Sequence, residues 1–332
     1  MSEGLEALRL LSANMGSDWL LVQGSGGNTS LKDNGIIWVK ASGKSLAKAK
    51  EENIFLPLDL KKIHEDIHRF GEMTVDIQSQ VYEGLLPSIE TTMHALMPHN
   101  VVLHSHPIDI IATSLIPEAR AKLRLALVDI AWHWIPYCRP GMPLTREVRS
   151  ALAKHPADVL ILANHGLVVG ATNTEEAALL QQNVVNRLRR IPREFTISSK
   201  LELMKELTSM DVAYIPYEPV IHSLAADPWS FELAKCNPAY PDHVVFCGVR
   251  PWVVEGTRNP PSVETAYGLV PGVGVILLPA ATAATEAMLR AQAEVYLRIP
   301  PGTAVNLLSD SQCAELINWD AEKYRKALEK AT

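Results

Sequence analysis

The sequence has few cysteines, and they do not follow the pattern of a disulfide framework. The four cysteines stand at 138, 236, 247 and 313 of 332 residues, and none forms a C-x-x-C pair. Such spacing argues for a reducing compartment. Residues 1–6 are acidic and lack the basic segment of a signal peptide. We therefore expect a cytoplasmic protein.

The sequence also lacks long apolar runs and a surplus of positive charge. No run approaches the roughly 18–20 apolar residues that cross a bilayer. The net charge is −6 and the pI is about 6.0, so neither a membrane nor a nucleic acid is an expected partner. Hydrophobic residues make up 47% of the chain, which is enough for a sizeable core. The proline-bearing segment 215–219 suggests a boundary between domains at 1–215 and 216–332.

Two glycine-rich turns, at 23–31 and 41–45, lack the complete motifs of nucleotide-binding proteins. Thr29 stands where the dinucleotide fingerprint needs its third glycine, and Trp38 stands where a P-loop needs its first. Glycine lets backbone N–H groups approach an oxyanion closely, and Asn28, Ser42 and Lys44 would add donors. The turns are interpreted as an anion cradle or, alternatively, as plain hairpin connections.

Histidines stand at the polar ends of two apolar segments. In the predicted strand 101–106, His104 and His106 point to one face because side chains alternate along a strand. His165 lies at the polar end of a second apolar strand, in the segment 158–166. Catalytic zinc usually takes three protein ligands and keeps one open position. We predict that these histidines form a metal site and that Glu90 lies beside it, in the first turn of a helix starting at 87–88. The alternative is that each histidine only caps its strand.

Further along, apolar spacing predicts helices over 174–190, 195–211, 287–299 and 314–329. Two segments of the C-terminal part resemble segments of the N-terminal part in sequence, and we refer to this similarity as the echo. Residues 281–287 resemble 171–177, and residues 241–247 resemble 98–104. The C-terminal domain is therefore either a degenerate partial repeat that lost its ligands or a chance likeness.

Five motifs together resemble the class II aldolase/adducin family in their order and spacing, over roughly residues 5–195. They lie at residues 26–30, 41–43, 87–90, 104–106 and 164–166. The resemblance implies an α/β fold, a three-layer αβα sandwich around a mixed, mainly antiparallel sheet. A smaller α/β domain would follow it. It also implies a homo-oligomer, often a ring-like tetramer.

The resemblance also implies roles for individual residues. Zn²⁺, or another divalent transition metal, would be held by His104, His106 and His165, with Glu90 as ligand or general acid/base. The residues that match phosphate-binding positions of the family are Asn28, Ser42, Gly43 and Ser88. One departure concerns Ile89, where enzymes acting on fuculose phosphate carry a second serine.

The expected activity is that of a metal-dependent aldolase. Such a lyase cleaves a ketose or ketose 1-phosphate by retro-aldol chemistry through a zinc-stabilised enediolate. The same site would also suit a sugar-phosphate dehydratase, a 3-keto sugar acid decarboxylase or an epimerase. A non-catalytic, adducin-like scaffold is the third alternative, although such a protein would be expected to lose the ligands. The expected partner is a small sugar or sugar phosphate.

Overall fold

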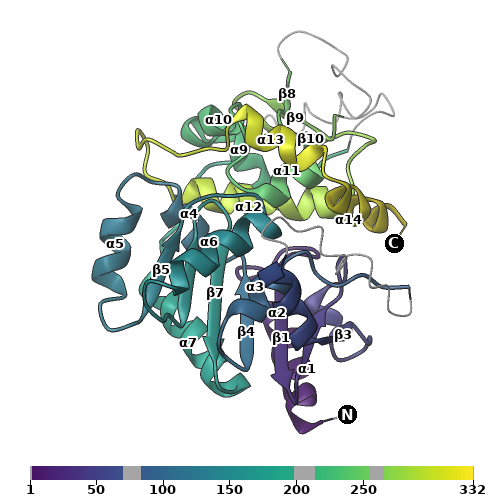
Figure 1. Ribbon diagram of the computed structural model, residues 1–332. Helices are drawn as coiled ribbons and strands as arrows, with labels where there is room; N and C mark the ends of the chain where they lie inside the picture. Colours follow the sequence, from purple (N-terminus) through teal and green to yellow (C-terminus); the bar gives the residue numbers. More distant parts are fainter. Residues whose placement is uncertain (1, 70–83, 198–213, 255–264, 332) are drawn as a thin grey trace. The chain divides into compact units, whose positions relative to one another are not determined.

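A computed structural model describes residues 2–69, 84–197, 214–254 and 265–331 (Figure 1). Two compact units are formed, one by residues 1–110 with 120–189 and the other by 111–119 with 190–332. The predicted helix 195–211 lies almost wholly outside the described residues, so the predicted boundary near 215 stays a prediction. Within the described ranges, no helix is both long enough and apolar enough to cross a membrane.

The first unit contains a seven-stranded sheet in the order β3-β2-β1-β4-β7-β6-β5. Its strands are β1 (Asn28–Asp33), β2 (Ile36–Lys40), β3 (Phe55–Asp59), β4 (Val101–Ser105), β5 (Trp132–Ile135), β6 (Val159–Leu162) and β7 (Gly166–Ala171). Only β5 and β6 pair in parallel, and the other neighbours are antiparallel. The expected mixed, mainly antiparallel sheet is confirmed.

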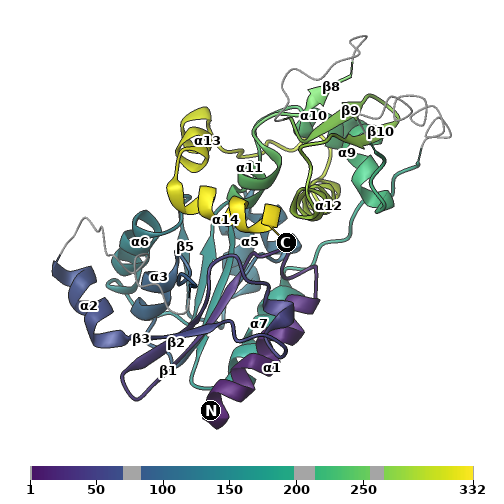
Figure 2. The same ribbon diagram turned by 90° about the vertical axis from the view of Figure 1, so that its right-hand side faces the viewer.

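Helices cover both faces of this sheet (Figure 2). One face packs against α1 (Glu3–Ser17), α5 (Ala119–Ala126), α7 (Thr174–Arg187) and the first residues of α4 (Ile108–Ser114). The other face packs against α2 (Leu60–Arg69), α3 (Thr91–Leu96) and α6 (Met142–Leu152). A short 3-10 helix, η1 (Leu46–Lys48), lies next to α1. The three-layer sandwich predicted from the resemblance is therefore present.

The central strand β4 shows how alternation orients the candidate ligands. Val101 and Leu103 pack in the core formed with α1 and α7, whereas Val102 packs with Met93 of α3 on the opposite face. Because side chains alternate along a strand, His104 shares the face of Val102 and lies on the side of α3.

The helix that follows the Pro87-Ser88 segment begins later than predicted. Pro87 forms an antiparallel bridge with Ala41, which keeps this part of the chain extended. Helix α3 starts only at Thr91, and Glu90 occupies the N-cap position without a side-chain capping bond. The predicted helix start at 87–88 is thus wrong. As a result, the Glu90 carboxylate is available for other contacts.

The second unit contains a three-stranded sheet in the order β10-β9-β8, together with helices. Its elements are η2 (Pro219–His222), α9 (Ser223–Ala226), α10 (Pro228–Ala234), α11 (Pro241–Cys247), β8 (Trp252–Val253), β9 (Tyr267–Val270), β10 (Gly274–Leu277), α12 (Ala283–Leu297), α13 (Asp310–Ile317) and α14 (Asp320–Ala331). Arg325 connects α14 to α11 by contacting Asp242 Oδ1 at 3.1 Å.

One half of the proposed echo has a structural counterpart and the other half does not. Helix α12 follows the antiparallel pair β9–β10, just as α7 follows β6–β7. Residues 241–247, however, form helix α11, whereas 101–105 form strand β4. Pro241 suits the first turn of a helix, where its missing N–H has no partner to lose. The equivalence of these two segments is therefore wrong.

Candidate metal centre

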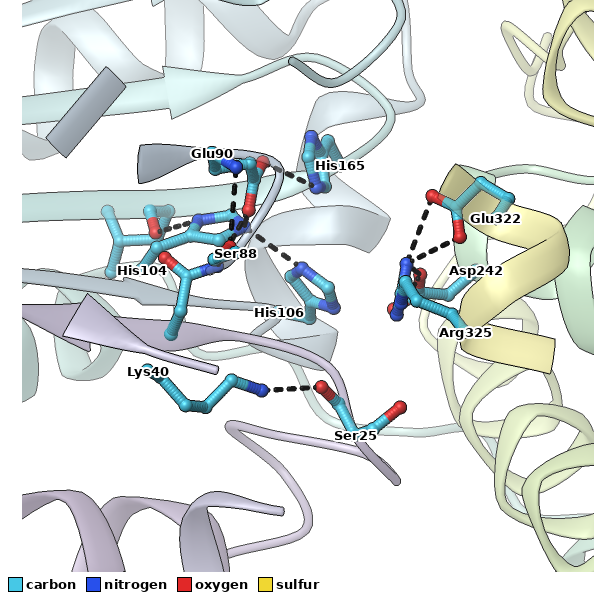
Figure 3. A network of polar contacts seen from close by, with 12 residues as sticks. Ser25, Lys40, Ser88, Glu90, His104, His106, His165, Asp242, Glu322 and Arg325 are labelled. Atoms are coloured by element: carbon cyan, nitrogen blue, oxygen red, sulfur yellow. Dashed lines mark hydrogen bonds and ion pairs between the residues drawn. The ribbon is translucent and has the colours of Figure 1, made fainter. Parts of the chain in front are cut away.

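Three histidine rings converge at one end of the sheet in the first unit (Figure 3). His104 lies in β4, His106 just after it, and His165 in the turn between β6 and β7. The ring centroids are 4.9 Å apart for the pairs His104–His106 and His104–His165, and 5.1 Å apart for His106–His165. One nitrogen of each ring lies within 4.8 Å of the others. The structure thus brings together the three histidines singled out in the sequence.

In the β6–β7 turn, His165 lies between a residue with left-handed backbone and a glycine in close contact with β4. Asn164 has φ +55°, a left-handed conformation that asparagine tolerates better than most residues. A Cβ atom on Gly166 would lie 2.3 Å from the Ser105 carbonyl oxygen. Glycine at this position therefore allows β7 to start directly against the end of β4, next to His106.

Backbone contacts fix the other two histidines. The His106 N–H donates to the Leu21 carbonyl at 2.8 Å. His104 Nδ1 lies 3.0 Å from the Leu167 carbonyl oxygen. Because a carbonyl only accepts, we assign the ring proton to Nδ1, and His104 Nε2 then presents its lone pair. Metal-binding imidazoles are commonly oriented by such a bond.

Glu90 lies among the imidazoles and is 5% exposed. Its Oε2 is 3.3 Å from His104 Nε2, and its Oε1 is 3.6 Å from His165 Nε2. Asn28 Nδ2 donates to Oε2 at 2.8 Å, while Oε1 accepts no hydrogen bond from any described residue. Burial alone would raise the pKa of Glu90, but the His104 and His165 rings, when they are protonated, and the Asn28 bond lower this pKa to about 2.

The donor set fits a divalent transition metal. Imidazole nitrogen is a preferred ligand of zinc, and bonds of 2.0–2.1 Å in a tetrahedron place two nitrogens about 3.3 Å apart. The Nε2 atoms of His104 and His106 lie 3.1 Å apart. Glu90 Oε1, which accepts no hydrogen bond from the described part of the chain, adds negative charge beside them. These features support the sequence-based ligand set, whose occupation by metal stays a prediction.

The predicted phosphate-binding residues lie on segments next to this centre. Asn28 is the direct partner of His104 in the pairing of β1 with β4, and its Nδ2 also donates to Ser88 Oγ at 3.2 Å. Ser42 is buried, and its N–H donates to the Leu86 carbonyl at 2.8 Å. Gly43 adopts φ +73°, which favours glycine. Asn28 and Ser88 therefore contact Glu90 or each other, while Ser42 and Gly43 stand at the end of the neighbouring strand.

Three other charged or titratable side chains have roles that the sequence did not reveal. Lys44, expected as a donor in the second turn, pairs with Glu52 at 3.0 Å. His94 is fully buried with Nδ1 2.8 Å from Ser30 Oγ, and burial is the main cause that lowers its pKa to about 3. Lys40 is buried and contacts both glycine turns, the first through Ser25 (Figure 3). Alternation along 36–40 places Lys40 on the face of Ile36 and Trp38, opposite to the buried Ile37 and Val39, so the local pattern gave no signal of its burial.

Comparison with known proteins gives the same framework. The model of the Class II Aldolase and Adducin N-terminal domain matches residues 11–189. The uncharacterized oxidoreductase YuxG of Bacillus subtilis (strain 168) is 32% identical over 191 residues, covering 53% of this chain but only 27% of YuxG. An L-fuculose phosphate aldolase of Methanococcus vannielii is 29% identical over 184 residues, covering 51% of this chain and 85% of that enzyme.

Among solved structures, the N-terminal class II aldolase domain of a conserved protein from Thermoplasma acidophilum is 25% identical, with a TM-score of 0.49. That likeness covers 57% of this chain and 93% of the Thermoplasma chain. The family match over 11–189 spans more than half of the 332 residues and contains every histidine of the candidate centre. The chain belongs to the family of the Class II Aldolase and Adducin N-terminal domain.

Proposed function

We propose that this protein is a metal-dependent lyase that cleaves a ketose or ketose 1-phosphate by retro-aldol chemistry. The observation that carries the proposal is the position of Glu90, whose two oxygens lie 3.3 Å from His104 Nε2 and 3.6 Å from His165 Nε2. A buried carboxylate beside three converging imidazoles provides both a cation site and a proton acceptor.

The histidines would hold the metal, with their rings oriented by the backbone. When bound, a divalent ion supplies Lewis-acid stabilisation of negative charge that develops on a substrate carbonyl oxygen. His104 would bind through Nε2, because its Nδ1 donates to the Leu167 carbonyl. Since His106 and His165 lie at a strand end and in a tight turn, small backbone shifts there would change the site directly.

Glu90 would carry the proton. In retro-aldol cleavage a hydroxyl loses a proton, the carbon–carbon bond breaks, and the carbon that keeps the electron pair gains a proton. Positive charge at this centre lowers the pKa of Glu90, so the carboxylate would be ionised at neutral pH and able to accept the hydroxyl proton. Returning that proton to carbon restores the carboxylate, so the cycle balances. Asn28 holds Oε2, and Oε1 accepts no hydrogen bond from a described residue.

The far end of the substrate would bind at the glycine turns. Ser42 and Ser88 would supply hydroxyl donors and Gly43 a backbone N–H suited to a phosphate group. Asn28, whose amide donates to Ser88 and Glu90, would orient that end of the site. Binding there would hold the carbon–carbon bond that is cleaved close to Glu90, which raises the effective concentration of the carboxylate at the reacting atoms.

The test is metal analysis followed by incubation with a panel of ketose 1-phosphates and unphosphorylated ketoses. We expect about one divalent ion per chain and release of an aldehyde that stops with a chelator and returns with Zn²⁺. Bound metal with water loss, carbon dioxide release or epimerisation instead would show the dehydratase, decarboxylase or epimerase alternative. A chain that binds no metal under any condition would contradict the proposal and favour a scaffold.

The family resemblance also supports assembly into a homo-oligomer, with a tetramer as the expected form, in the cytoplasm. Light scattering coupled to gel filtration measures the assembly directly. A strictly monomeric protein with full activity would contradict this part of the proposal.

A further inference from the structure

Lys40, the last residue of β2, is 2% exposed although it carries a charge. Its Nζ donates to the Ser25 carbonyl oxygen at 2.7 Å (Figure 3). It also donates to the Lys44 carbonyl oxygen at 2.7 Å. Lysine is seldom fully buried, because removing an ammonium from water is costly unless hydrogen bonds compensate for it. The two carbonyl groups are part of that compensation, so the ammonium holds both in place.

These two carbonyl groups belong to different glycine-rich turns. Ser25 lies in the turn that leads to Asn28, and Lys44 follows Ser42 and Gly43. The two turns are otherwise separated by the hairpin β1–β2. A single side chain therefore links the two turns that carry donors of the proposed anion site.

The backbone of Lys40 reaches the third segment of that site. The Lys40 carbonyl accepts from the Ser88 N–H at 3.1 Å, and the next residue, Ala41, bridges to Pro87. One residue thus contacts all three segments, 23–28, 41–45 and 86–88.

We propose that Lys40 is a positioning residue for the anion-binding end of the active site. This inference rests on the proposed function, because the proposed function assigns those three segments to the same end of the substrate. The ammonium holds the turns at the separation that an anion needs and adds a fixed positive charge behind them. It acts through the turns and not on the reacting atoms, so its loss weakens anion binding more than it slows the chemistry.

The variant Lys40→Met keeps the length of the side chain but removes its charge and its donors. We expect its affinity for inorganic phosphate, measured by calorimetry on the metal-loaded protein, to fall about tenfold or more, equivalent to about 1.4 kcal/mol. KM for a phosphorylated substrate should rise by a similar factor while kcat changes less. Lys40→Arg, which keeps charge and donors, should recover part of the affinity.

The matched control is Lys48→Met. Lys48 is a nearby lysine that lies 3.5 Å from Glu52 and whose side chain is 55% exposed. The Lys48→Met variant should bind phosphate as tightly as the wild type. The proposal would be overturned if Lys40→Met bound phosphate as tightly as the wild type, or if Lys48→Met lost as much phosphate affinity as Lys40→Met. It would also be overturned if Lys40→Met lost its metal together with its phosphate affinity.

A measurement on the unmodified protein covers the case in which Lys40→Met does not fold. Inorganic phosphate should slow hydrogen exchange in both turns, 23–28 and 41–45, and protection of neither or only one would contradict a shared anion site. The proposed function and the role of Lys40 can fail independently of each other. If the protein binds phosphate but cleaves no carbon–carbon bond, the proposed function is rejected and the role of Lys40 is not. If the protein cleaves its substrate but Lys40→Met binds phosphate as the wild type does, the role of Lys40 is rejected and the proposed function is not.

Discussion

Asn28 and His104 are directly paired in the antiparallel ladder between β1 and β4. The same Asn28 donates a hydrogen bond to Glu90, whose carboxylate lies 3.3 Å from His104 Nε2. A residue at the end of the first glycine turn is therefore connected to the candidate metal centre through both backbone pairing and a side-chain contact. This connection means that changes in either part are expected to affect the other.

Replacing His104 with alanine should abolish metal binding while the chain still folds. The change removes one of three ring donors and leaves the Leu167 carbonyl without its partner, a loss of about 1–3 kcal/mol in stability. Metal content by mass spectrometry and the far-UV spectrum test this. His99→Ala, which removes a ring that pairs with Asp158, is the control and should keep its metal. Full occupancy in His104→Ala would rule out this ligand.

Replacing Glu90 with glutamine should preserve metal binding but reduce turnover by about a hundredfold or more, the usual contribution of a positioned acid or base. The glutamine oxygen can still accept from Asn28, whereas the amide cannot exchange the proton. Steady-state kinetics on the metal-loaded variant measures the effect. Glu65→Gln, an exposed change on α2, should behave as wild type. Undiminished turnover in Glu90→Gln would remove Glu90 from the mechanism.

Replacing Gly166 with alanine should weaken both the fold and the metal site. The new Cβ would lie 2.3 Å from the Ser105 carbonyl oxygen and 3.3 Å from His106 Cα, so β7 must shift. We expect a loss of about 1–3 kcal/mol in stability, as for other overpacked sites, and weaker metal binding. Gly4→Ala, in α1 against a flexible Leu31 side chain, is the control and should not weaken metal binding. Thermal melting and metal titration of both variants test the difference.

The stability of the protein should depend on pH partly through His243. Burial lowers the pKa of this fully buried ring to about 3, so it stays neutral in the folded state, whereas the unfolded chain binds a proton below about pH 6.5. Stability therefore falls as the pH drops from about 6.5 to 3, by at most about 1.4 kcal/mol per pH unit from this residue. Below pH 3 both states are protonated and the contribution levels off.

The test compares melting temperatures of the wild type and His243→Leu between pH 4 and 7. The variant should lose less stability on acidification, because one proton uptake is removed. Parallel curves would show that His243 does not titrate in this way.

Local patterns in the sequence determined a large part of the fold. Period-two alternation placed His104 and His106 on one face of β4, and the apolar spacing of 174–190 corresponds to α7 (Thr174–Arg187). The absence of a third glycine and of a complete P-loop excluded the common nucleotide motifs. These features depend on neighbours within a few residues, which is why they can be recognised in the sequence.

The sequence predicted that the three histidines share a site, and the tertiary structure supplies the pairing and burial that bring them together. His165 approaches His104 because β7 pairs with β4 across more than 60 residues of chain, and the bridge between Ala41 and Pro87 delays α3 and releases Glu90. Burial of Lys40 against two separate turns and the helical state of residues 241–247 likewise depend on long-range packing. Local propensities are worth only fractions of a kcal/mol per residue, so pairing and burial between distant segments override them.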